Sequence, residues 1–80
     1  MQLFVKSLMG NTWKLNGVKE TTNVETLKLL IYRITSMHPS DQMLFSGSVQ
    51  LEDPYHVGKY GLVDGSTLRL HPKMRSGLWA

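Results

Sequence analysis

The stretch that organises the chain reads Ser66-Thr67-Leu68-Arg69-Leu70-His71-Pro72. Leu68 and Leu70 are two residues apart, with polar or basic residues on either side of each. Successive side chains of a β-strand point to opposite faces, so this alternation predicts a strand with a buried leucine pair. Arg69 and His71 then lie on its exposed face. Because Pro72 has no N–H to donate to a neighbouring strand, the strand should end there.

Composition limits what the chain can be. Its 80 residues suffice for one small domain, and a hydrophobic content of 41% is too high for a disordered chain. There is no cysteine, which excludes disulfides and thiolate metal sites. The net charge of +3 comes from scattered lysines and arginines, whereas nucleic-acid binders more often carry a dense basic run. With no apolar run long enough for a membrane span and no secretory signal pattern, we expect a cytoplasmic or nuclear protein that binds neither membrane nor nucleic acid.

The residues before the final strand predict a hairpin and one helix. Alternation over residues 1–7 and 12–15, separated by a turn at Gly10, indicates two antiparallel strands. A helix should follow over residues 24–34. Its buried stripe is predicted to be Val24, Leu27, Ile31 and Ile34. Its N-terminal capping box is predicted to be Thr22 and Glu25. Two short strands over residues 42–45 and 49–51 and a tight turn near residues 57–60 complete the order ββαββ, short turn, β, an α+β fold.

The order and spacing of these residues resemble ubiquitin over about residues 1–75. The specific matches are Met1-Gln2-Leu3-Phe4-Val5-Lys6, Leu51-Glu52-Asp53 and Ser66-Thr67-Leu68 followed by Leu70. The resemblance implies a β-grasp fold, a mixed sheet packed on one helix with the last strand parallel to the first. It implies a ubiquitin-like domain over residues 1–73, with residues 74–80 as a flexible tail or the start of a linker to further domains.

The resemblance also implies a partner-binding patch. In ubiquitin the corresponding surface positions form one patch on which other domains dock. In this chain they are Leu8, Phe45, Ser48, Arg69, His71 and Lys73. Phe45 is larger than the family's residue, His71 replaces an aliphatic side chain and Arg69 a histidine. These departures mean that ubiquitin's own receptors cannot be assumed to bind this domain.

Two further features concern the helix. The resemblance pairs Lys28 with Asp53, which predicts a structural ion pair because a partly buried ammonium needs a carboxylate nearby. Leu30 and Ile34 add apolar surface beyond one core contact. They indicate either closer packing or a second contact face.

The tail argues against conjugation. A conjugated modifier ends in Gly-Gly, whereas here the matching pair is Ser76-Gly77 and three residues follow it. Five of ubiquitin's seven lysine positions are occupied by other residues: Asn11, Leu30, Ile34, Val49 and Asp64.

We therefore expect a non-enzymatic, monomeric protein-interaction module without metal or cofactor. It would dock on ubiquitin-binding domains or on receptors of the ubiquitin–proteasome pathway. The alternatives are a covalent modifier trimmed after Gly77 and an unprocessed ubiquitin mimic.

Overall fold

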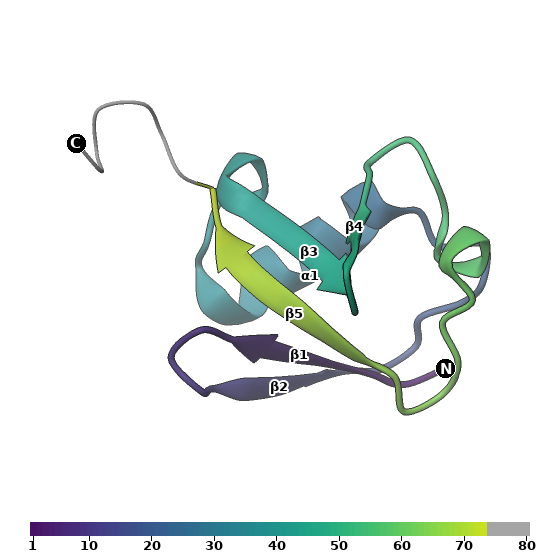
Figure 1. Cartoon of the computed structure of the whole chain (residues 1–80), viewed down its shortest axis with the longest axis horizontal. Helices are drawn as coiled ribbons and strands as arrows, with labels where there is room; N and C mark the ends of the chain where they lie inside the picture. The colour runs from purple at the N-terminus through teal and green to yellow at the C-terminus, as the bar shows by residue number, and fades with distance from the viewer. Residues whose placement is uncertain (74–80) are drawn as a thin grey trace.

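A computed structural model describes residues 1–73 (Figure 1). Five strands form one sheet, namely β1 (Leu3–Ser7), β2 (Thr12–Leu15), β3 (Gln42–Ser46), β4 (Val49–Leu51) and β5 (Thr67–Pro72). One α-helix, α1 (Val24–Thr35), and two short 3-10 helices, η1 (Pro39–Asp41) and η2 (Val57–Tyr60), lie between the strands. The predicted order of elements is confirmed. The predicted tail, residues 74–80, lies outside the described residues.

The final strand is the centre of the sheet, whose order is β2-β1-β5-β3-β4. β5 pairs with β1 in parallel, with Leu68 opposite Val5, and with β3 antiparallel, with Leu70 opposite Leu44. Pro72 is the last paired residue of the strand. The mixed sheet on one helix that the ubiquitin resemblance implied is thereby confirmed.

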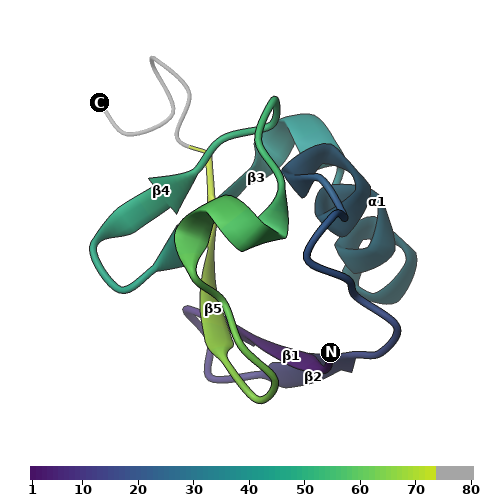
Figure 2. The ribbon, with the colours of Figure 1, turned by 90° about the vertical axis from the view of Figure 1, so that its right-hand side faces the viewer.

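The core lies between the sheet and α1, which packs on one side of β5 (Figure 2). Alternation along the strands turns the following residues inward, all almost fully buried: Leu3, Val5, Leu15, Leu44, Leu51, Leu68 and Leu70. From the helix, Val24, Leu27 and Ile31 meet them. At Gly17, where φ is +75°, the chain bends after β2 and brings Val18 into the same core.

The start of α1 differs from the prediction. Asn23 is the N-cap, and its side-chain oxygen accepts a hydrogen bond from the backbone N–H of Thr26 at 2.9 Å. The hydroxyl of Thr22 accepts instead from the backbone N–H of Lys19. The predicted capping box of Thr22 and Glu25 is therefore wrong. Asn competes with Thr for this position because its side-chain oxygen reaches the same orphan N–H groups.

The predicted core stripe is wrong at its last residue. Ile34 is 45% exposed, whereas Ile31, one turn earlier, is buried. At 3.6 residues per turn, Ile34 lies only roughly 20° around the helix from the buried Leu27. Its exposure therefore follows from its place in the last turn of α1 and not from the face of the helix on which it lies. Leu30, which the pattern left off the stripe, is half-buried and packs against the core.

This difference predicts unequal costs for two similar truncations. Leu30→Ala should lower the free energy of unfolding by about 1–2 kcal/mol because it removes core contacts. Ile34→Ala should change it by less than about 0.7 kcal/mol. Urea denaturation of both variants checks this. Equal costs would show that Leu30 and Ile34 pack alike.

Candidate functional site

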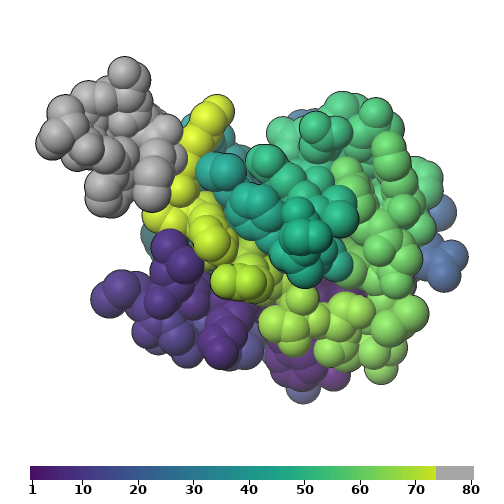
Figure 3. Space-filling model, viewed as in Figure 1, coloured from purple at the N-terminus to yellow at the C-terminus, as the bar shows by residue number. Residues whose placement is uncertain are grey.

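The outward side of the sheet carries the candidate site. Side chains that alternate with the buried ones define what we call the outer face: Phe4, Lys6, Thr12, Lys14, Met43, Phe45, Gln50, Thr67, Arg69 and His71. They come from all five strands. In Figure 3 the residues of β1, β5 and β3 meet on one continuous surface, and the ribbon of Figure 1 shows α1 behind the sheet. Segments far apart in the sequence thus build a single face.

An aromatic pair lies near its centre. Phe45 on β3 is opposite Arg69 on β5 and diagonal to His71. The rings of Phe45 and His71 contact edge to face, with centroids 5.0 Å apart and planes at 63°. Both residues are half-buried. Such pairs add about 0.5–1.5 kcal/mol beyond area burial, which holds the two rings in place before any partner arrives.

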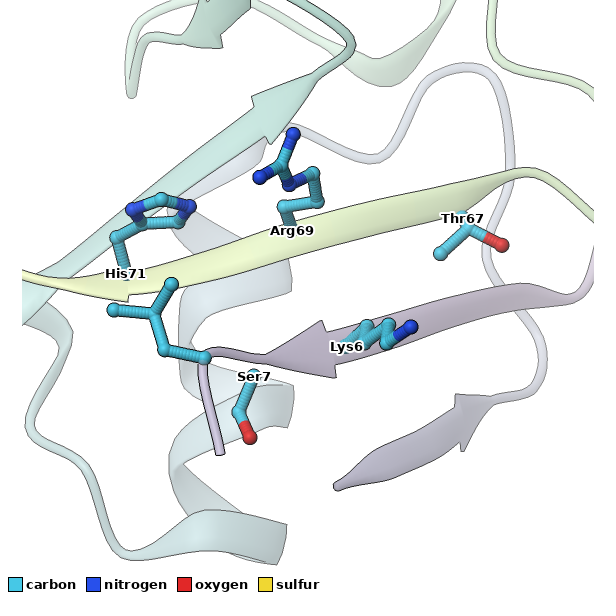
Figure 4. Close-up of a pocket in the computed structure, with 6 residues that line it drawn as sticks. Lys6, Ser7, Thr67, Arg69 and His71 are labelled. Carbon is cyan, nitrogen blue, oxygen red and sulfur yellow. The ribbon is translucent and has the colours of Figure 1, made fainter. Parts of the chain in front are cut away.

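A hollow of about 440 Å³ adjoins this pair on the β1–β5 side. It is lined by Lys6, Ser7, Leu8, Thr67, Arg69 and His71. Figure 4 shows Thr67, Arg69 and His71 in a row along β5, with Lys6 on β1 beside them. The hollow is open to solvent and mixes cationic groups with apolar carbon. It can accept a side chain of a partner but does not enclose one.

The structure brings most of the predicted patch together. Arg69 and His71 line the hollow with Leu8, which is 61% exposed just after β1, and Phe45 contacts His71. Lys73 lies at one end, where it lines a smaller apolar hollow of about 380 Å³ with Met43, His71 and Pro72. Ser48 is at the exposed tip of the β3–β4 turn, next to Gly47, and does not line the first hollow.

Seven of the ten outer-face residues did not appear among the predicted site residues, and Phe4, Lys6 and Thr67 are the ones that adjoin the hollow or its lining. Lys6 and Thr67 line the hollow, and Phe4 lies in register with Thr67. Alternation along residues 1–7 already placed Phe4 and Lys6 opposite the buried Leu3 and Val5. That they adjoin β5 depends on the parallel pairing, which periodicity cannot show.

The predicted ion pair is present and borders the outer face near β3 and β4. Lys28 Nζ lies 2.6 Å from Asp53 Oδ1, with the lysine side chain 11% exposed and the aspartate 52%. Lys28 and Asp53 line a third hollow with Gln42, Lys73 and two outer-face residues, Met43 and Gln50. Because the ammonium is the more buried partner, the carboxylate offsets its desolvation.

The remaining predicted sites are not brought to the outer face. Leu30 and Ile34 lie on α1, which packs on the opposite side of the sheet. Gly77, the predicted conjugation end, lies outside the described residues. Within residues 1–73, no three His, Cys, Asp or Glu side chains come close enough to hold a metal ion. In the same part of the chain, no helix has the length and apolar character that crossing a bilayer requires.

Comparison with known proteins identifies the family. The sequence model of the ubiquitin family matches residues 3–75, which is most of the chain. A mouse protein, AN1-type zinc finger protein 4, is 32% identical over 77 residues. This alignment covers 96% of the present chain but 10% of the mouse protein, so the chain spans about a tenth of that relative's length. Together with the five-stranded mixed sheet on one helix, these matches show that the chain belongs to the ubiquitin family.

Proposed function

We propose that this domain is a noncovalent interaction module on whose outer face partner proteins dock. The observation that carries the proposal is the preformed patch of Phe45, His71, Leu8 and Arg69 beside an open hollow. Exposed apolar surface rimmed by polar residues marks interaction sites in soluble proteins, and here the exposed Leu8 lines the hollow with Arg69 and His71. The partner would bind by burying these side chains, and no covalent bond would form or break.

The patch supplies both affinity and orientation. Anchors at the centre of an interface contribute about 2 kcal/mol or more when they are fully desolvated. Phe45 occupies that position, because outer-face residues surround it on β4 and β5. Arg69 beside Phe45 and Lys73 at the rim would set the orientation of the partner more than its affinity.

Family membership supports the wider role. Domains of the ubiquitin family generally bind other proteins, and we propose that this one links a larger protein to the ubiquitin–proteasome system in the cytoplasm or nucleus. A domain that matches about a tenth of its relative's length fits a module within a longer chain. We propose that the isolated domain acts as a monomer.

Phe45→Ala tests the proposal. Measured by calorimetry against a panel of ubiquitin-binding domains and proteasomal receptors, the variant should bind at least tenfold more weakly than the parent domain to whichever partner the parent binds. Leu29→Ala is the matched control, because Leu29 is 49% exposed on α1, on the other side of the sheet. A Phe45→Ala variant that binds every such partner as the parent does would refute docking through the outer face.

A further inference from the structure

We infer that the partner docks through an acidic segment, with its carboxylates over β1 and β5 and an apolar side chain on Phe45. The inference rests on the proposed function and names the chemistry of the partner. It follows from how charge is distributed across the outer face, which is a property of this sequence.

The outer face carries cations and no anion. Lys6, Lys14 and Arg69 project from it, and within the described strands there is neither Asp nor Glu. The six acidic residues of the chain lie on helices or in loops: Glu20, Glu25, Asp41, Glu52, Asp53 and Asp64. Among residues 1–73, none of the three outer-face cations forms an ion pair. Their charge therefore remains available to a partner.

Near the middle of the outer face, two cations lie on the same side of Phe45. One row across the sheet, fixed by the strand register, runs Thr12, Lys6, Arg69, Phe45, Gln50. Positive charge thus occupies β1 and β5, whereas β3 presents Met43 and Phe45. In Figure 4 the side chains of Lys6 and Arg69 point away from each other on the adjacent strands β1 and β5.

The spacing of the row defines the segment. Neighbouring strands are about 4.8 Å apart, so Arg69 lies roughly 5 Å and Lys6 roughly 10 Å from Phe45 across the sheet. A helix rises about 1.5 Å per residue, so residues at i, i+3 and i+7 recur at about these distances on one face. A partner helix lying across the strands would place an apolar residue on Phe45, and Asp or Glu three and seven positions away over Arg69 and Lys6.

An acidic protein segment fits this face better than a nucleic acid. Single strands bind by stacking bases on free aromatic faces along a basic groove. The edge-to-face contact between Phe45 and His71 covers part of the ring surface that a base would need. Leu8 and Met43 border the aromatic pair with flexible aliphatic carbon, which suits an apolar side chain.

Selection from a displayed library of random 16-residue peptides tests the inference. The bait is the 80-residue domain, and the sequences recovered should combine a large apolar residue with Asp or Glu at the spacing given above. Lys6→Glu/Arg69→Glu should remove the acidic enrichment and weaken the best recovered peptide about tenfold at low salt. Lys19→Glu/Arg33→Glu is the matched control, because it changes the net charge equally in a loop and on α1, away from the sheet. Circular dichroism would show that both double variants are folded.

The outcomes separate the inference from the proposed function. Recovered peptides that depend on Phe45 but show no acidic enrichment would overturn the inference and leave docking on the outer face intact. If no peptide is recovered, or if Phe45→Ala recovers the same peptides, both fail. A single-stranded 12-nucleotide DNA that binds more tightly than the best peptide would also overturn the inference, because Lys6 and Arg69 would then bind phosphate groups.

Discussion

Leu68→Ala should lower the free energy of unfolding by about 3–4 kcal/mol, one of the two largest effects that we expect from a single substitution in this domain. Leu68 is fully buried on the central strand, opposite Val5 of β1. The truncation removes three carbons at a site enclosed by strands on both sides, so the cavity cannot readily collapse. A domain of this size has about 5 kcal/mol of stability in total, and the variant should be close to unfolding at room temperature.

Urea denaturation followed by tryptophan fluorescence checks this expectation. Trp13 packs against the same core, so its emission should report the loss of structure. The control is Thr67→Ala on the exposed face of the same strand, which should cost less than about 1 kcal/mol. A cost below about 1.5 kcal/mol for Leu68→Ala would contradict the central position of β5 in the core.

The same leucine pair shows how far the sequence predicts the fold. Alternation alone identified Leu68 and Leu70 as buried, because a two-residue period leaves few other arrangements. That β5 lies between β1 and β3 depends on pairings between residues some 60 positions apart for β1 and roughly 24–30 positions apart for β3, which local periodicity does not encode. The parallel pairing was therefore predicted by resemblance to a family, and the structure confirms it.

The N-cap of α1 and the exposure of its last turn could not be predicted from the sequence pattern alone. Thr22 and Asn23 both offer a capping oxygen, and the choice between them depends on the path of the preceding loop. Here Thr22 Oγ1 already accepts from Lys19, which leaves the cap to Asn23. Ile34 fits the helical period of the buried residues. Whether the sheet covers the last turn of α1, however, depends on the tertiary structure.

For the candidate site, the sequence supplied the residues and the fold supplied their arrangement. Phe45, Arg69 and His71 each faced outward by alternation. Their contact across β3 and β5 follows from the antiparallel register of those strands. The absence of acidic residues from the strands was visible in the printed sequence, but it had no meaning until the strands were known to share one face.

At Gln42 the alternation of the strand predicts a buried side chain, whereas the polarity of glutamine favours an exposed one. The pattern that turns Leu44 inward turns Gln42 inward as well, and the structure buries this side chain to 3% exposure. Its Nε2 donates to the carbonyl oxygens of Lys28 at 2.8 Å and Met37 at 2.9 Å. The amide therefore joins β3 to the middle of α1 and to the segment that follows it. Its Oε1 is buried without a hydrogen-bond partner among the described residues.

Gln42→Glu should destabilise the domain by about 3 kcal/mol or more at neutral pH. The substitution keeps the shape of the side chain but replaces the donor NH₂ with a carboxylate oxygen. Two carbonyl oxygens would then face a buried negative charge with no proton between them. Thermal unfolding followed by circular dichroism measures the change, and the variant should unfold at a Tm well below that of the parent domain.

Gln42→Met separates the charge from the loss of the hydrogen bonds. Methionine fills a similar volume and removes the unpaired Oε1, but leaves the carbonyls of Lys28 and Met37 without this donor, a change that should cost about 1–2 kcal/mol. If Gln42→Glu costs no more than Gln42→Met, the site is open to water or the side chain turns outward. The two hydrogen bonds would then not be what holds α1 on the sheet at this point. A larger cost for glutamate would measure the penalty of a buried charge that faces these two oxygens, whereas the cost of Gln42→Met itself measures the loss of the amide N–H groups.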